Sequence, residues 1–149
     1  MIIRTVCLLM LAMLLLACAP DDIGTLPPER PFGTISGQAV AGPIANAQVT
    51  VYGFGNGTQG TRLGSAQTDD NGAYSIDIQA PSQIVLVEIR GGSYVEEASG
   101  TPVALADEQV LRAIGRYRSG QPLTLMVTPL THMAVALAEY NIGNGMAVA

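Results

Sequence analysis

The chain contains no lysine and no tryptophan, and it has one histidine and two cysteines among its 149 residues. Its seven cations are therefore all arginines, against twelve acids, and the formal net charge is −5. An acidic chain does not favour nucleic acid as a partner, because phosphate binding needs clustered Lys and Arg. One His and two Cys leave too few ligands for most zinc sites. These shortages argue against most hydrolases and metalloenzymes, so we expect no cofactor and no catalytic residues.

Charged residues make up 13% of the chain and aromatic residues 5%. The charged fraction is about half of the quarter that is usual in globular proteins. The length suits one domain, or one domain with a tail. Because aromatic residues are scarce, any core must be built mostly from Val, Ile, Leu and Ala.

The N-terminus carries an uncharged apolar run over residues 5–17, directly after Arg4. A proline and two aspartates follow shortly afterwards, at residues 20–22. The run falls short of the roughly 20 residues that span a bilayer, but it has the length of a signal-peptide core. The pattern predicts a signal peptide over residues 1–17, with a transmembrane anchor as the less favoured alternative.

The apolar run ends on Leu15, Leu16, Ala17 and Cys18. This tetrapeptide resembles the lipobox of bacterial lipoproteins, which has a Leu three residues before the Cys and a small residue directly before it. The resemblance implies that Cys18 takes a diacylglyceryl group on sulfur, that cleavage occurs before Cys18, and that the new amino group is acylated, with palmitate as a typical chain. Two or three acyl chains anchor a protein stably, as one chain does not. The alternative is an incidental or buried cysteine.

Residue 19 is Ala rather than Asp. In sorting of the enterobacterial kind, an Asp at this place favours the inner membrane, so the resemblance favours the outer membrane of a bacterial cell envelope. The expected partner is then the membrane itself, through Cys18. Cleavage would remove Cys7 and leave Cys18 as the single cysteine, which excludes an intramolecular disulfide.

Residues 18–33 comprise the lipidated cysteine and a proline-rich segment with four prolines and several charges. Such a stretch cannot form a helix and has little apolar surface to bury. We interpret it as an extended tether. At about 3.1 Å per residue, fifteen residues would reach roughly 45 Å from the membrane.

Residues 34–127 show the period-two alternation of half-buried strands, interrupted by Gly, Pro, Asn and Asp turn signals. This pattern predicts an all-β domain, an antiparallel β-sandwich of about seven strands. Residues 84–89 are apolar at every position except Glu88, which predicts a more buried strand. The segment 110–117 fits both a strand and a helix, and we favour a strand. The predicted strands cover residues 35–39, 47–52, 62–68, 74–78, 84–89, 110–117 and 123–127.

Residues 128–149 are predicted to form a C-terminal α-helix, or the start of a truncated helical region. Thr128 can cap this helix, Pro129 suits its first position, and Gly143 can end it. His132 is expected on the wetter flank. One apolar stripe is expected to comprise Leu130, Met133, Ala134, Leu137 and Tyr140 or Asn141.

Residues 35–40, 42–51 and 68–76 resemble the carboxypeptidase regulatory-like modules. The shared pattern is a first strand with a Gly, a "G-x-x-x-x-A-x-V" second strand and a "T-D-x-x-G-x-Y" hairpin. The resemblance covers about residues 34–90 and implies a transthyretin-like or Ig-like sandwich of the Cna-B type. The family's peptidase chemistry does not carry over, since His132 is the only His. Its Lys–Asn cross-link cannot form without Lys. Residues 91–100 and 127–131 are similar to bacterial lipoproteins in which a larger helical region follows.

Two groups of polar residues are weak candidate sites. Asp69, Asp70, Asn71 and Asp77 carry oxygen ligands that suit Ca²⁺, but their spacing does not match an EF-hand loop and Asp-Asn-Gly is an ordinary hairpin turn. We favour the turn. The second group could form a surface that contacts a glycan or an envelope protein. The alternative is an ordinary solvated mixture of charges. Its members are Glu96, Glu97, Arg90, Arg112, Arg116 and Arg118.

The sequence thus predicts a non-catalytic, lipid-anchored envelope protein whose β-sandwich acts as a binding, structural or spacer module. The alternative is an accessory domain of a longer envelope enzyme or transport component whose active region follows Ala149. A calcium-dependent adhesin is a third and weaker hypothesis.

Overall fold

The structure is a computed structural model that describes residues 29–106 and 108–146. The predicted signal peptide, Cys18 and most of the tether lie outside the described residues. The described elements are β1 (Gly33–Gln38), β2 (Gln48–Gly55), β3 (Thr58–Gln67), β4 (Ala73–Ile78), β5 (Gln83–Arg90), β6 (Ser93–Val95), β7 (Pro102–Ala104), β8 (Val110–Tyr117), β9 (Leu123–Thr124) and α2 (Pro129–Gly143).

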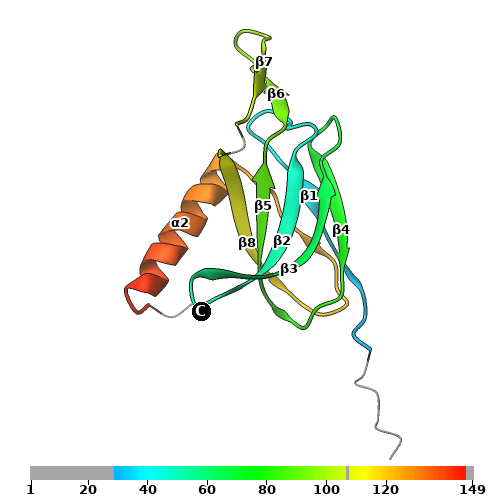
Figure 1. The fold of residues 1–149 in the computed structure, drawn as a ribbon, viewed down its shortest axis with the longest axis vertical. Helices are drawn as coiled ribbons and strands as arrows, with labels where there is room; N and C mark the ends of the chain where they lie inside the picture. The colour runs from blue at the N-terminus through cyan, green and yellow to red at the C-terminus, as the bar shows by residue number, and fades with distance from the viewer. Residues whose placement is uncertain (1–28, 107, 147–149) are drawn as a thin grey trace, which may run out of the picture.

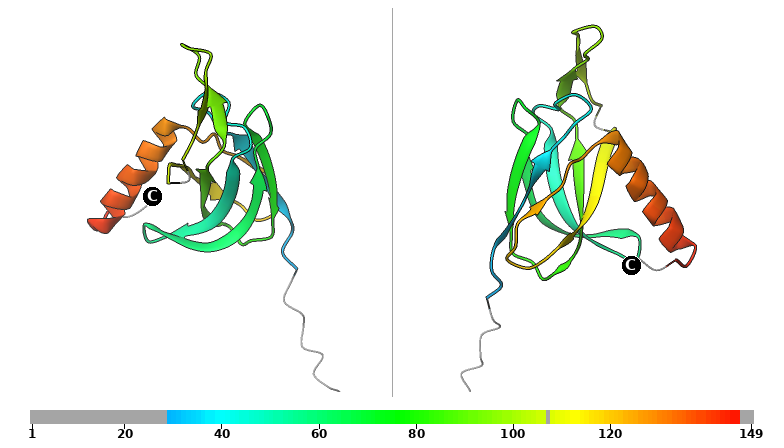
Figure 2. Two further views of the ribbon diagram at one scale, coloured as in Figure 1. Left: turned by 45° about the horizontal axis from the view of Figure 1, so that its top comes forward. Right: turned by 180° about the vertical axis from the view of Figure 1, so that it is seen from behind.

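Two sheets pack face to face, and α2 covers the outer face of the larger one (Figures 1 and 2). The smaller sheet has the strand order β4-β1-β9, and the larger has the order β3-β2-β5-β8. The predicted all-β sandwich with one C-terminal helix is therefore confirmed. Nine strands are described rather than about seven, because β6 and β7 form a separate short arm that projects from one end.

The main core lies between the two sheets and consists almost entirely of aliphatic side chains. Alternate residues of β5 point into it, and Val85, Val87 and Ile89 are at most 1% exposed. Leu86 is also fully buried, but it belongs to a second cluster with Phe54 and Val135 on the helix side of the sheet. Burial on both faces explains why this strand is apolar at nearly every position.

The last strand pairs differently from the prediction. Only Leu123 and Thr124 form β9, and they lie parallel to Ile35 and Ser36 of β1 rather than antiparallel. The chain continues alongside β1, where Leu125 N–H donates to the Ser36 carbonyl at 2.8 Å. A parallel pair became possible because the intervening chain crosses from one sheet to the other before it returns beside β1.

Gly37 lies at the closest approach of β1 to this returning chain. A Cβ at Gly37 would overlap the carbonyl oxygen of Leu125 and lie 2.8 Å from the Tyr74 hydroxyl. The same hydroxyl donates to the Leu125 carbonyl at 2.6 Å. Burial raises the pKa of Tyr74 above its ordinary range, which keeps the phenol protonated as the donor. Glycine is required here because backbone and side chain meet where a Cβ would stand.

The N-terminus of α2 agrees with the prediction. The Thr128 hydroxyl accepts from Thr131 N–H at 3.1 Å, while Thr131 Oγ1 accepts from Thr128 N–H at 2.9 Å. These two bonds form a reciprocal capping box, and Pro129 follows directly. Within residues 29–106 and 108–146, no helix is long and apolar enough to cross a membrane.

An apolar stripe on a helix is normally buried, but most of the predicted stripe of α2 faces solvent. Leu130, Met133, Leu137 and Tyr140 are 60–75% exposed, whereas Val135 is fully buried against the sheet. The helix is apolar on both sides, so the stripe did not decide which side faces the protein. The sheet side is fixed by Val135 and by an ion pair in which Arg112 Nη1 and Nη2 donate to Glu139 Oε1 and Oε2 at 2.7 and 3.0 Å.

His132 also departs from the prediction. It is half-buried rather than on the wetter flank, and its Nδ1 atom is buried with no hydrogen-bond partner among the described residues. His132 is half-buried because it lies on the side of the helix that contains Val135 and Glu139. This side turns toward the sheet.

Candidate functional site

The predicted calcium ligands are divided between the two ends of β4. Asp69 Oδ1 accepts from the backbone N–H groups of Asn71 and Ala73 at 2.9 and 2.8 Å, so this carboxylate organises the hairpin turn. Asp77 lies near the far end of β4, where its Oδ1 accepts from the Thr34 hydroxyl at 2.7 Å. Across the described ranges, no cluster of three or more His, Cys, Asp or Glu residues could hold a metal ion.

The predicted contact surface is also divided. Glu96 and Glu97 lie in the arm beyond β6, while Arg116 and Arg118 lie at the last residues of β8 and just after it, at the opposite end of the sandwich. Arg112 is engaged by Glu139 on α2, and Arg90 pairs with Glu88 at 2.7 Å. The six residues therefore do not form one surface.

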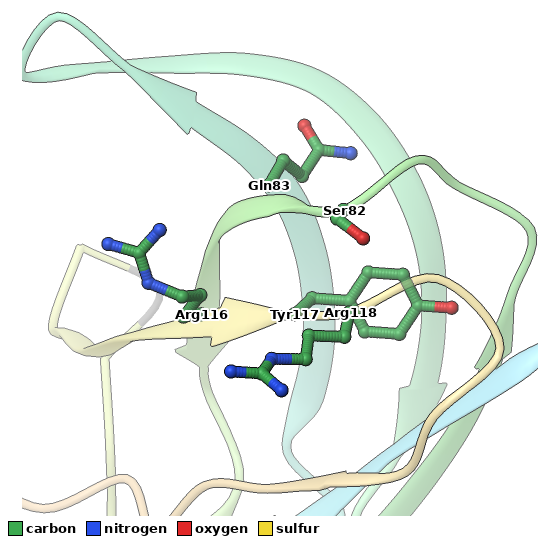
Figure 3. A pocket seen from close by; sticks show the side chains of 5 residues that line it. All are labelled: Ser82, Gln83, Arg116, Tyr117 and Arg118. Carbon is green, nitrogen blue, oxygen red and sulfur yellow. The ribbon is translucent and has the colours of Figure 1, made fainter.

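A cavity of about 350 Å³ is present where β5 begins and β8 ends. Its walls include both arginines of the β8 end, and Figure 3 shows their guanidinium groups on the side away from the phenol of Tyr117. Tyr117 is fully buried, whereas Arg116 and Arg118 are exposed, as the alternation along a strand requires. The lining residues are Ser82, Gln83, Arg116, Tyr117 and Arg118.

Hydrogen bonds from backbone N–H groups to side-chain oxygens hold this end of the sandwich together. Ser82 Oγ accepts from Ser119 N–H at 3.0 Å, which ties the turn before β5 to the loop after β8. Tyr117 Oη accepts from Gly120 N–H at 3.1 Å. Gly120 has a φ of +73° and packs on Pro31, where an added Cβ would lie 2.6 Å from the ring. The cavity thus lies at the end of the sandwich where the chain enters β1.

The lining of the cavity is rich in hydrogen-bond donors. Two guanidiniums, one hydroxyl and one amide supply hydrogen-bond donors, and guanidinium geometry suits carboxylate and phosphate oxygens. None of the five lining residues is His, Asp, Glu or Cys. Sequence reasoning singled out Arg116 and Arg118 but missed Ser82 and Gln83, because only the pairing of β5 with β8 brings them together.

Comparisons with known proteins yield little. No protein-family model matches the chain. No curated protein matches it either. Among solved structures, it is similar to a 9R-lipoxygenase from Cyanothece PCC8801, with 19% sequence identity and a TM-score of 0.41. The match covers 80% of this chain and 20% of the lipoxygenase chain. A similarity this weak carries no argument about activity.

Proposed function

We propose that the protein is a non-catalytic, lipid-anchored protein of the bacterial cell envelope. The observation that carries this proposal is the sequence Leu15-Leu16-Ala17-Cys18 at the end of the apolar run 5–17. A lipobox has a small residue directly before the cysteine and follows the apolar core of a signal peptide, and this sequence has both features. Acylation at Cys18 would then hold the mature chain on a membrane, with the outer membrane as the favoured one.

The arrangement of the sandwich supports a role as a binding or spacer module. The chain enters β1 at Gly33 directly after the proline-rich segment. The tether would therefore connect the acylated Cys18 to the first strand of the sandwich. The cavity with Arg116 and Arg118 lies at the same end, where Gly120 of the loop after β8 packs on Pro31. This end would therefore remain within reach of the anchoring membrane, where an acidic glycan or an acidic segment of an envelope protein is the partner that suits two guanidiniums.

Substitution of the two cysteines tests the proposal. Each variant of the full chain is produced in bacteria that are fed radiolabelled palmitate, and the protein is then purified. Cys18→Ser is expected to lose all label and to migrate as the longer precursor, because the acyl acceptor and the cleavage site are both lost. Cys7→Ser is the matched control and is expected to be labelled like the wild type, since Cys7 would leave with the signal peptide. Label that persists in Cys18→Ser, or a wild type without label, would contradict the proposal.

A further inference from the structure

The outward face of α2 carries a regular row of large apolar side chains. Leu130, Met133, Leu137 and Tyr140 are 75%, 66%, 60% and 69% exposed, and we call these four residues the α2 seam. Their sequence spacing is three, four and three. This is the alternating spacing of the two core positions of a coiled coil, which places side chains along one line for packing against another helix. The seam therefore suits a helical partner.

The flanks of the seam are small or uncharged. Ala134 and Ala136 border it and are exposed, and Asn141 lies at the next flanking position. These are the positions where charges usually decide which coiled-coil helices pair. The one charged residue of α2, Glu139, points toward the sheet and is paired with Arg112. Two identical seams can therefore approach each other without like-charge repulsion, although the chain as a whole is acidic.

The seam is also held in place before any partner arrives. Val135 anchors α2 in the cluster with Phe54 and Leu86, and the capping box at Thr128 fixes the first turn. A free helix of this length is marginal in water. Because the folded domain already bears the cost of ordering α2, a partner would not have to do so.

The area of the seam is sufficient for a small symmetric interface. A large apolar side chain presents on the order of 200 Å² when fully exposed, so these four together expose on the order of 500 Å². That is at the upper end of the apolar patches of ordinary monomers. Two such faces would bury a total of about 1,000 Å², the lower limit for a specific interface.

We propose that the α2 seam binds the α2 seam of a second copy of this chain, so that the protein forms a weak twofold homodimer. A twofold pair uses the same patch on both subunits, which a neutral, self-complementary seam allows. Contact with a lipid surface fits less well, because helices that lie in the membrane interface are rich in Lys and Arg, and α2 contains neither. The proposal does not depend on lipidation, although anchoring both copies in one membrane would raise their effective concentration.

Cysteine cross-linking in the full chain tests the dimer. Leu137→Cys places a thiol in the seam, and Val95→Cys places one on the β6–β7 arm at a similar exposure of 54%. Cells that produce each variant, and the wild type as background, are treated with a short membrane-permeant bis-maleimide. We expect Leu137→Cys to give roughly tenfold more covalent dimer than Val95→Cys, because only a specific interface keeps two thiols together.

A second substitution distinguishes the seam from chance collision. Met133→Glu, added to Leu137→Cys, is expected to reduce cross-linking to the level of the Val95→Cys control, since it places like charges in the interface. At protein concentrations too low for dimer formation the melting temperature should stay unchanged, because Met133 is exposed in the single chain. The proposal is overturned if Leu137→Cys cross-links no more than Val95→Cys, or if mass spectrometry shows that the product contains a different protein.

Discussion

Replacing Gly37 with alanine is expected to destabilise the sandwich by about 3–5 kcal/mol, at the upper end of what single substitutions do. The new Cβ would meet the Leu125 carbonyl oxygen and the Tyr74 hydroxyl. To make room, the returning chain would have to move away from β1. This movement would break the bond from Leu125 N–H to Ser36 and the bond from the Tyr74 hydroxyl. The measurement is the denaturant midpoint of unfolding.

Gly55→Ala is the matched control for this prediction. Gly55 is also a strand glycine without a positive φ, but a Cβ there would meet nothing within 4 Å. Its free energy of unfolding, derived from the midpoint, is expected to change by no more than about 0.5 kcal/mol. Equal effects at the two glycines would contradict the close pairing of residues 123–127 with β1.

Substitution of Val135 with aspartate is expected to release α2 from the sheet. The carboxylate would be buried against Phe54 and Leu86 without a partner, which costs several kcal/mol. A released helix of this length would not stay helical in water. The main core lies on the other side of the larger sheet, so the sandwich should persist. In hydrogen exchange, we expect the amides of α2 to lose protection while those of β5 keep it.

Ala136→Asp provides the control, since Ala136 is the next residue along the helix and faces outward. Protection of α2 should remain as in the wild type, because the added carboxylate stays in water. If Ala136→Asp released the helix and Val135→Asp did not, the two faces of α2 would be assigned the wrong way round.

Patterns that depend on local chemistry were predictable from the sequence. The alternation in residues 74–78 predicted β4, and the nearly continuous apolar run over residues 84–89 predicted β5. Thr128 and Pro129 predicted the start of α2. Each of these signals acts within a few residues, through pleating, burial or a capping hydrogen bond. The all-β sandwich with a terminal helix followed from their sum.

Features that depend on distant partners were not predictable. Both sides of α2 are apolar, and the buried one is selected by Val135 in its cluster with Leu86 and by the ion pair between Arg112 and Glu139. The parallel pairing of β9 requires the chain to return beside β1, which no local pattern encodes. The short β6 and β7 are three residues each, too short for an alternation to stand out.

The candidate site shows the same division. Arg116 and Arg118 were named from the sequence as charged residues of a possible contact surface, and both line the cavity. Glu96 and Glu97 were grouped with them by charge alone. The arm that carries these two glutamates projects from the other end of the sandwich, so charge composition could not place them.

The mass of the N-terminal peptide is a direct test of acylation at Cys18. The protein is extracted from its own cells with detergent and cleaved after Glu29. We expect a peptide that begins at Cys18 and is heavier than its amino-acid mass by two or three acyl chains. A peptide that begins at Cys18 without acyl groups, or one in which the bond between Ala17 and Cys18 is intact, would contradict it.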